Sequence, residues 1–488
     1  MIFKVYIILI TLFPIILLTA YAEHGDTTTF VKTFGSIEND YAYHIQQTSD
    51  SGYIVAGQTD SYGSGSPMKP DVWIIKLDIF GNKEWEKTFG GEEGDGAFFI
   101  QETTDKCYIL AGTTSSYGNG HPSIWIIKLN SEGDSIWTRL YEGKVVSTAQ
   151  SIKQTADGGY IIAGRGNENI IKLDTNGEIQ WGKHFGWLFY SVQQTKDNGY
   201  IAVGDTIFQQ QEWSYIPSQY IIKLDRAGTK EWLNPLGDDF TGRAVSVEQT
   251  TDGGYIVAGD SIDIKSQFEQ SHYAMVMKLS SNGRPEWKYF GNEHSNAQYI
   301  NQTADGGYIF AGNTLDSEHG LDFLIVKLDE NGREEWIRTY GSVGTWEYAS
   351  SIQQTFNGGF IVAGQTESYG AGRYDIWILK LDQDGNLSGP SETFYPEFPK
   401  NNKYLLEQNY PNPFISFTTI NYKLPVAKMT SLRIFNLLGK EISTLVNEFQ
   451  SAGSYTCIWN RFSVPSGVYY YRLQTGNHSE TRKMILIK

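Results

Sequence analysis

TADGGYIIAG at residues 155–164 is the stretch that decides the fold, because variants of it occur seven times along this chain of 488 residues. Glycine provides the positive φ that a tight hairpin requires, and the aspartate accepts hydrogen bonds from its own turn. The apolar residues after the turn favour a strand. The aromatic residue that directly follows the turn marks each copy and recurs at intervals of 40 to 55 residues. The seven positions are Tyr53, Tyr108, Tyr160, Tyr200, Tyr255, Tyr308 and Phe360.

Each repeat divides into four strand signals, which in the second copy cover residues 96–103, 107–113, 123–129 and 134–140. The third strand is almost wholly apolar, as VWIIKL at residues 72–77 illustrates, and this is typical of a strand covered on both faces. Repeats of this length that contain only strands indicate propeller blades. We therefore predict an all-β protein with a seven-bladed β-propeller over residues 23–389.

A second motif, Leu-Asp-x-x-Gly-x-x-x-Trp, follows the third strand and is expected to place its Trp between neighbouring sheets, as at Trp85. The seventh repeat lacks this Trp and has Gly389 at that place. Residues 29–35 (TFVKTFG) match residues 84–90 (EWEKTFG), with Phe30 in the position of Trp. We expect the N-terminal strand to complete the last blade and close the ring, since closure removes exposed sheet edges.

The first 22 residues have the pattern of a signal peptide, with Lys4, an apolar run at residues 5–18 and a small-x-small cleavage site at residues 20–22. No later run is long and apolar enough to predict a transmembrane helix. The two cysteines, Cys107 and Cys457, do not form a disulfide framework by their spacing.

Composition changes after the repeats. Residues 390–404 are predicted to be a Pro-rich linker, and residues 400–488 hold eleven Lys and Arg against four Glu, a balance of +7. Because the whole chain carries −16 and Lys4 adds +1, residues 23–399 carry −24. Such an acidic domain disfavours nucleic acid and anionic membranes as partners, and it suits cations or neutral glycans better.

The last segment, residues 405–488, contains several motifs in order: Asn409-Tyr410-Pro411-Asn412-Pro413-Phe414, a Gly turn at Gly439, and Gly467 followed by Tyr469. Together they resemble the type A C-terminal sorting domain of the type IX secretion system, although Ile415 stands where that family commonly has Asn. Alternating apolar residues and Gly turns independently predict a small Ig-like β-sandwich. The resemblance implies a partnership with the type IX machinery, and secretion or outer-surface attachment after removal of the signal peptide and of this domain.

The repeats also resemble those of bacterial exported proteins with the signature Gln-Gln-Thr-x-Asp-Gly-Gly-Tyr, a family that implies no particular activity. Motifs for nucleophilic, metal-dependent or phosphate-binding catalysis are missing from the sequence, and the eight His are scattered. We assign no catalytic residue, metal ligand or cofactor, and leave calcium binding open. Acidic residues between blades are interpreted as a solvated rim, with a catalytic pair of carboxylates as the alternative, at Asp40, Glu93, Asp95, Asp238, Asp239 and Glu293.

The variable connections between the second and third strands are the candidate recognition surface. Three of them contain Ser-Tyr-Gly, and a fourth is rich in aromatics, so that the candidate ligand-binding residues are Tyr62, Tyr117, Trp213, Tyr215 and Tyr369. The alternative interpretation of the tripeptide is a loop-shaping remnant of duplication. The favoured hypothesis is a non-catalytic surface or secreted binding protein, acting in adhesion, matrix contact or capture of a glycan or protein. The alternative is a secreted carbohydrate-active enzyme, a glycosidase or lyase, with carboxylates on the loop face.

Overall fold

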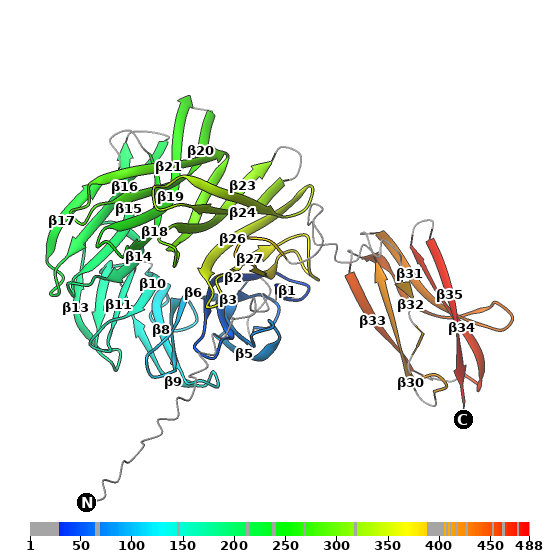
Figure 1. Ribbon diagram of the computed structural model, residues 1–488. Helices are drawn as coiled ribbons and strands as arrows, with labels where there is room; N and C mark the ends of the chain where they lie inside the picture. Colours follow the sequence, from blue (N-terminus) through cyan, green and yellow to red (C-terminus); the bar gives the residue numbers. More distant parts are fainter. Residues whose placement is uncertain are drawn as a thin grey trace, which may run out of the picture.

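In the computed structural model every regular element of the described residues is a β-strand (Figure 1). The predicted signal peptide and linker lie outside the described residues, as do Trp213, Tyr410 and Ile415. The structure describes residues 29–63, 69–143, 147–210, 214–236, 241–266, 269–316, 320–387, 405–406, 408–409, 411–414, 417–424, 428–450, 453–460, 464–475 and 478–487.

The larger group of sheets consists of antiparallel strands that follow one another in chain order. The first sheet contains β2 (Asp40–Gln47), β3 (Tyr53–Thr59), β4 (Asp71–Leu77) and β5 (Lys83–Phe89). The second contains β6 (Asp95–Glu102), β7 (Tyr108–Thr114), β8 (Ser123–Leu129) and β9 (Ser135–Tyr141). The third contains β10 (Thr148–Gln154), β11 (Tyr160–Arg165), β12 (Ile170–Leu173) and β13 (Ile179–Lys183).

The next strands repeat this order but are joined in pairs of sheets. A single bridge between Ser218 and Thr241 connects the fourth set, β14 (Leu188–Gln194), β15 (Tyr200–Gln210), β16 (Ser214–Leu224) and β17 (Lys230–Pro235), to the fifth, β18 (Thr241–Gln249), β19 (Tyr255–Ser266), β20 (Glu269–Leu279) and β21 (Pro285–Glu293). A short parallel pairing of β24 with β26 connects the sixth set, β22 (Ser295–Gln302), β23 (Tyr308–Asp316), β24 (Gly320–Leu328) and β25 (Glu334–Tyr340), to the last, β26 (Thr345–Gln354), β27 (Phe360–Thr366) and β28 (Asp375–Leu381).

The repeated turn folds as its sequence indicates. The Asp157 carboxylate accepts hydrogen bonds from the Thr155 hydroxyl and from the Gly159 amide at 3.0 Å, and Gly158 has a φ of 81°. The same carboxylate lies 2.9 Å from the ammonium of Lys172, which is buried in the third strand. No periodic pattern in the sequence marks this lysine. Its counterparts each contact the turn Asp of their own sheet: Lys76, Lys128, Lys223, Lys278 and Lys327.

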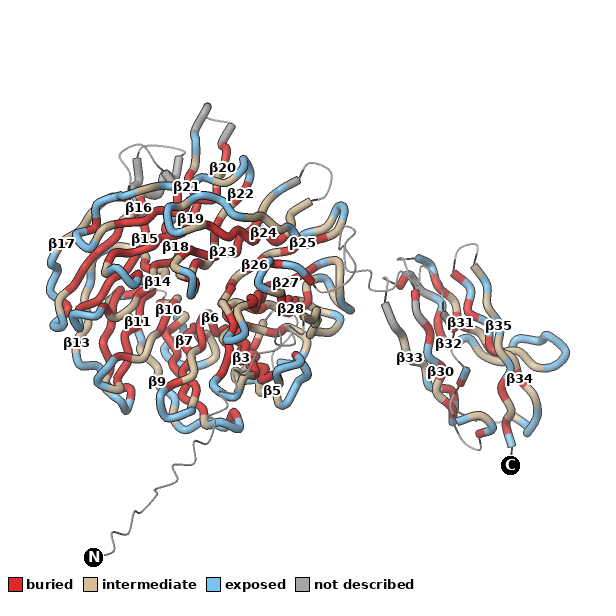
Figure 2. The backbone as a smooth tube through the Cα atoms, viewed as in Figure 1, coloured by how far each residue is buried: buried red, intermediate tan, exposed pale blue. Residues whose placement is uncertain are grey.

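Neighbouring sheets pack face to face. Second and third strands are buried, whereas the fourth strands are exposed along one edge (Figure 2). The Trp of each fourth strand packs on the aromatic residue of the next sheet, with a centroid distance of 6.0 Å between Trp85 and Tyr108. A side chain at Gly133, in the following turn, would lie within 2.7 Å of the Trp85 ring, so the recurrent glycine lets the Trp dock.

The N-terminal strand β1 (Phe30–Phe34) pairs antiparallel with β28, which is the pairing expected from the sequence. Phe30 packs on Tyr53 at 5.9 Å, in the position that Trp85 occupies against Tyr108. Residues of the first and last sheets share one core cluster, in which Ile45 and Val55 lie with Ile361 and Ile376. The strand that begins the repeats therefore completes the last sheet.

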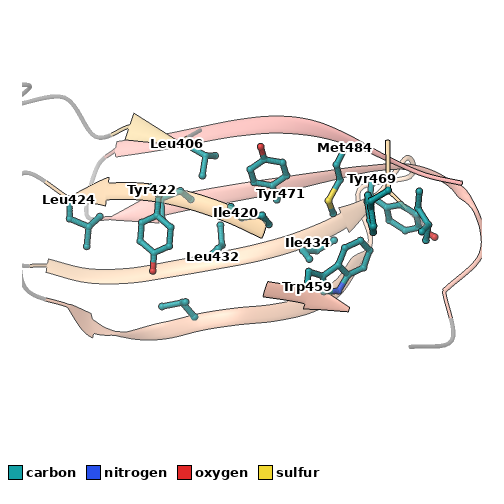
Figure 3. Packing of buried hydrophobic residues seen from close by; sticks show 14 residues of the cluster. Leu406, Ile420, Tyr422, Leu424, Leu432, Ile434, Trp459, Tyr469, Tyr471 and Met484 are labelled. Carbon is teal, nitrogen blue, oxygen red and sulfur yellow. The ribbon is translucent and has the colours of Figure 1, made fainter. Parts of the chain in front are cut away.

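The C-terminal residues form two sheets over one core (Figure 3). Asn409 donates its amide proton to the Tyr471 hydroxyl at 2.8 Å, Phe414 is buried beside Trp459, and the Tyr469 hydroxyl donates to Pro465 at 2.6 Å. The first sheet contains β29 (Leu405–Leu406), β30 (Phe417–Leu424) and β33 (Gly453–Asn460), and the second contains β31 (Lys428–Asn436), β32 (Glu441–Gln450), β34 (Gly467–Thr475) and β35 (His478–Leu486).

Candidate functional site

The first strands of the repeats lie toward the middle of the repeat region (Figure 1). Their residues line one cavity of about 330 Å³, which we name the central pocket. Each of these strands has a β-bulge at the equivalent position of the repeat, near the middle of the strand. A bulge inserts one extra residue and re-aims its side chain. The bulged residues, one from each sheet, line the pocket: Tyr43, Phe98, Gln150, Tyr190, Val245, Gln298 and Ser350.

Aromatic rings form one side of the central pocket. Tyr43 and Phe98 pack with a centroid distance of 5.1 Å, and Tyr348 lies on the neighbouring β26. Burial raises the pKa of Tyr43, and it raises that of Tyr348 to about 12, so both phenols are neutral at physiological pH. Within the described residues neither hydroxyl has a protein partner. Two further polar atoms at this pocket, Ser151 Oγ and Gln365 Oε1, are buried without a hydrogen-bond partner among the described residues. Buried polar atoms of this kind need water or a ligand.

Charged groups contact two other residues that line the pocket, Tyr190 and Arg243. Tyr190 donates to the Asp205 carboxylate at 3.2 Å. The Asp260 carboxylate accepts a hydrogen bond from the backbone N–H of Arg243 at 3.0 Å. The Nε of the Arg243 guanidinium lies 3.4 Å from the same carboxylate, and the Nδ1 of His272 lies 3.3 Å from it. Burial raises the pKa of Asp205 to about 6, against the lowering effect of the Tyr190 hydrogen bond. Of these groups Tyr190 and Arg243 line the pocket, so that a hydroxyl and a guanidinium, with its fixed N–H donors, are the polar groups nearest to it here.

His44, Phe99 and Tyr299 form the floor of the central pocket. His44 Nε2 lies 3.3 Å from the Tyr299 hydroxyl, and the His44 ring packs on Phe99 at 3.8 Å. Burial, with a smaller effect from Lys153, lowers the pKa of His44 well below its ordinary value. The Lys153 ammonium lies 4.5 Å from the Phe99 ring centre, and burial lowers its pKa to about 8. No group of three or more His, Cys, Asp or Glu that would hold a metal ion occurs among the residues that the structure describes.

Glutamines of the recurrent Gln-Gln-Thr stretch tie each sheet to its neighbours. The second Gln accepts a backbone N–H from the hairpin turn of the preceding sheet, as Gln154 does from Thr104 at 2.9 Å. Gln47 makes the same bond to Phe356 of the last sheet at 2.8 Å. The first Gln accepts from the following sheet, as Gln101 does from Gln154 at 2.8 Å. These recurrent residues thus serve the scaffold and are not free for a ligand.

The three Ser-Tyr-Gly loops are used in the same way. Tyr62 packs on Trp73 at 5.1 Å and donates its hydroxyl to the Gly35 carbonyl at 2.8 Å. Tyr117 and Tyr369 repeat this arrangement with Trp125 and Gly90, and with Trp377 and Gly341. Although Tyr62 and Tyr117 are about half exposed, their hydroxyls are already engaged, and ligand binding by them stays a prediction. Trp213 lies outside the described residues, and Tyr215 belongs to β16 with a side chain that is not described.

The interpretation of the acidic residues as a solvated rim is wrong for Asp40 and Asp95. Both are buried, and the serines of the Ser-Tyr-Gly loops satisfy their carboxylates, since Ser61 donates to Asp40 at 2.7 Å and Ser116 donates to Asp95 at 2.6 Å. Glu93 forms an exposed ion pair with Lys69 at 2.7 Å, and Glu293 accepts from Ser271. Asp238 and Asp239 lie outside the described residues.

The comparisons with known proteins bear on the C-terminal segment. Residues 408–488 match the secretion system C-terminal sorting domain. This sorting domain implies that the protein is secreted and attached to the outer surface, with removal of the tail. Within the described residues no helix is long and apolar enough to cross a membrane.

Similarity to solved structures is weak. PorZ, a surface component of the type IX secretion system of Porphyromonas gingivalis, is 12% identical to this chain with a TM-score of 0.41. The alignment covers 91% of this chain and 59% of PorZ, so this chain spans about three fifths of the length of PorZ. The Pan2 WD40 domain of Neurospora crassa is 10% identical (TM-score 0.39, covering 74% and 100%), as is polysaccharide lyase Uly1 (0.43, covering 75% and 94%). At TM-scores below 0.5 these similarities carry no functional argument. No curated protein matches the chain.

Proposed function

We propose that this protein is a surface-displayed glycan-binding protein whose repeats form a closed seven-bladed β-propeller. The pairing of β1 with β28 and the Gln47 bond to Phe356 support closure, because they give the first and last sheets the contacts that all other neighbours have. The C-terminal domain serves the type IX machinery, and residues 1–22 serve as the signal peptide. The repeat region is then the cargo that reaches the cell surface.

The arrangement of the central pocket carries the proposal. Aromatic rings with unengaged hydroxyls line the same cavity as the guanidinium of Arg243, and a sugar presents the matching chemistry, with apolar C–H faces and hydroxyl edges. The surroundings do not favour a polyanion, because Asp205 and Asp260 offset the positive charge of Arg243 and the repeat region as a whole is acidic. Neutral glycans are therefore the expected ligands.

Retention of purified protein on arrays of neutral polysaccharides tests this function. We expect binding that Phe98→Ala weakens, whereas Phe356→Ala, which removes a ring 71% exposed on a hairpin turn, leaves binding unchanged. Equal binding by the wild type and Phe98→Ala would exclude the central pocket as the binding site. Reducing ends released in the same wells distinguish binding from hydrolysis.

A carbohydrate-active enzyme is the second candidate, and Asp205 is the observation that favours it. A carboxyl group with a pKa raised to about 6, bonded to a tyrosine that lines the pocket, has the properties of a general acid. Release of reducing ends or unsaturated products that Asp205→Asn abolishes, with retention of the glycan on that variant, would establish the enzyme. Retention without release leaves the binding protein.

A further inference from the structure

We propose that Leu437 and Leu438, at the tip of the turn between β31 and β32, dock the C-terminal domain into an apolar socket of the type IX secretion machinery. The match of residues 408–488 to the sorting domain supplies the partner, and the inference rests on that proposed role of the domain. The turn lies at one end of the domain, together with Gly467 and Leu486; we name this the distal end.

Both leucines expose most of their surface. Leu437 is 66% exposed and Leu438 is 92% exposed, whereas Leu432 and Ile434 of the preceding strand are completely buried in the core of the same domain. A leucine in water forgoes the free energy that its burial would bring. Large apolar side chains that lie side by side on a surface are typical of a contact with another protein.

The turn itself does not require leucine. The side-chain oxygen of Asn436 accepts hydrogen bonds from the backbone N–H groups of Leu438 and Lys440, both at 3.0 Å, and Gly439 has a φ of 75°. The repeats build the same turn after their third strands, where Asp174, for example, accepts the N–H groups two and four positions ahead at 2.8 Å. In six of the seven repeats, the two positions that correspond to the leucines hold no large apolar residue. Folding of the turn therefore does not account for the leucines.

The strand register gathers separate segments of the domain at the distal end. β31 ends at Asn436, which pairs with Tyr469 near the start of β34. Gly467, the first residue of β34, pairs with Leu486 at the end of β35, and Phe414 forms a parallel bridge to the same residue. The leucine turn thus extends from a rigid end of the sandwich, and its two side chains are presented in a fixed place.

The repeats are attached at the opposite end of the domain. β29, which follows the predicted linker, pairs with Tyr422 and Lys423 at the end of β30. Figure 3 shows Leu424, the last residue of β30, at one end of the core and Tyr469 at the other. A cargo attached beside Leu424 leaves the distal end accessible to a partner.

The exposed side chains define the chemistry of the partner surface. A socket that takes up two leucines is apolar, and acidic residues at its rim complement the domain, because residues 400–488 carry a balance of +7. Burial of one leucine increases affinity on the order of 10-fold. Replacement of both leucines by serine should therefore release most of the protein from the machinery.

The experiment produces the full chain in a bacterium that carries the type IX machinery, and measures the fraction that protease added to whole cells removes. Three variants are compared with the wild type: Leu437→Ser/Leu438→Ser, Leu437→Met/Leu438→Met and, as the matched control at the opposite end, Met429→Ser, at a site 54% exposed. We expect the serine pair to lower surface display at least tenfold and to accumulate inside the cell with its C-terminal domain uncut. The methionine pair and Met429→Ser should be displayed as the wild type is.

The other outcomes contradict the inference in distinguishable ways. Display of the serine pair at the wild-type level, or an equal loss in Met429→Ser, overturns the leucine contact. A chain without residues 408–488 is the reference, because its display would show that the sorting role itself is wrong. Thermal melting of the purified variants detects misfolding, and if the serine pair melts below the wild type, display of Leu437→Ala/Leu438→Ala decides instead.

Discussion

The lysine of the last sheet offers a direct test of how the repeats are stabilised. Lys172 and its five counterparts contact a turn Asp, but in the last sheet Asn357 takes that place, and its Oδ1 lies 3.2 Å from the buried Lys380 ammonium. Burial lowers the pKa of Lys380 to about 8, and Asp382 compensates only in part. We predict that Asn357→Asp stabilises the protein, since the variant supplies the missing carboxylate.

The magnitude follows from the pKa of Lys380. A decrease from 10.5 to about 8 corresponds to about 3 kcal/mol of unfavourable free energy while the lysine is charged. The equivalent aspartates are more than half exposed, as Asp157 is at 53%, so solvent screening reduces the gain that a carboxylate brings. We expect Asn357→Asp to raise the free energy of unfolding by about 1–2 kcal/mol at pH 7.

The pH dependence identifies the mechanism. A lysine whose folded pKa is lowered releases its proton more readily in the native state, so the wild type gains stability as the pH rises from about 8 to 10.5. Guanidinium unfolding should therefore show that the advantage of Asn357→Asp shrinks between pH 7 and pH 10. Asp157→Asn, which recreates the Asn–Lys arrangement at Lys172, should destabilise by a similar amount at pH 7. An unchanged or lower stability of Asn357→Asp at pH 7 would refute the reasoning.

Three further predictions concern closure, a buried acid pair and secretion. Phe30→Ala should destabilise the repeat region by about 3–5 kcal/mol, seen as a lower melting temperature, whereas Ile37→Ala, at a site 74% exposed, should not. Burial, with added repulsion from Asp40, raises the pKa of Asp375 to about 6, so the charge of this carboxylate destabilises the fold as the pH rises through about 4 to 6. In denaturant titrations, Asp375→Asn should therefore raise the free energy of unfolding by about 1–3 kcal/mol at pH 8 and leave it unchanged at pH 4. Deletion of residues 408–488 should prevent surface display, and protection of the truncated protein from protease added to whole cells would show this.

Most of the local structure was predictable because the recurrent residues act within one repeat or between neighbours. The Thr-x-Asp-Gly-Gly hairpins, the Trp docked behind each turn glycine and the pairing of the N-terminal strand all depend on short-range patterns. The buried lysine was overlooked, since a Lys inside an apolar strand has no periodic signal of its own. Its significance appears only when the hairpin brings Lys172 against Asp157.

The candidate site was less predictable. Exposed loop aromatics were the expected binding residues. In the Ser-Tyr-Gly loops, however, the Tyr62 hydroxyl donates to the Gly35 carbonyl, and this bond restricts the side chain in a way that the sequence does not reveal. The central pocket depends on bulges that place Tyr43 and Phe98 side by side from positions 55 residues apart. Two adjacent aromatics in the first strands, as at Phe98-Phe99, were the signal in the sequence, but a bulge has no simple residue signature by which to interpret them.

Departures from the repeat at the pocket floor replace residues that stabilise the scaffold elsewhere. At the position of the first Gln, Gln46, Gln101, Gln193 and Gln353 accept a backbone N–H of the next sheet, and Glu248 does so as well. Lys153 occupies the same position. Because its ammonium group cannot accept a hydrogen bond, the bond from the backbone N–H of the next sheet is not formed there. The charge of Glu248 compensates the buried Lys153 in part, and the Lys153 ammonium lies 4.5 Å from the centre of the Phe99 ring, which lines the central pocket. Residues that determine binding specificity are therefore expected at positions where the repeats differ, since the residues that recur in every repeat stabilise the scaffold.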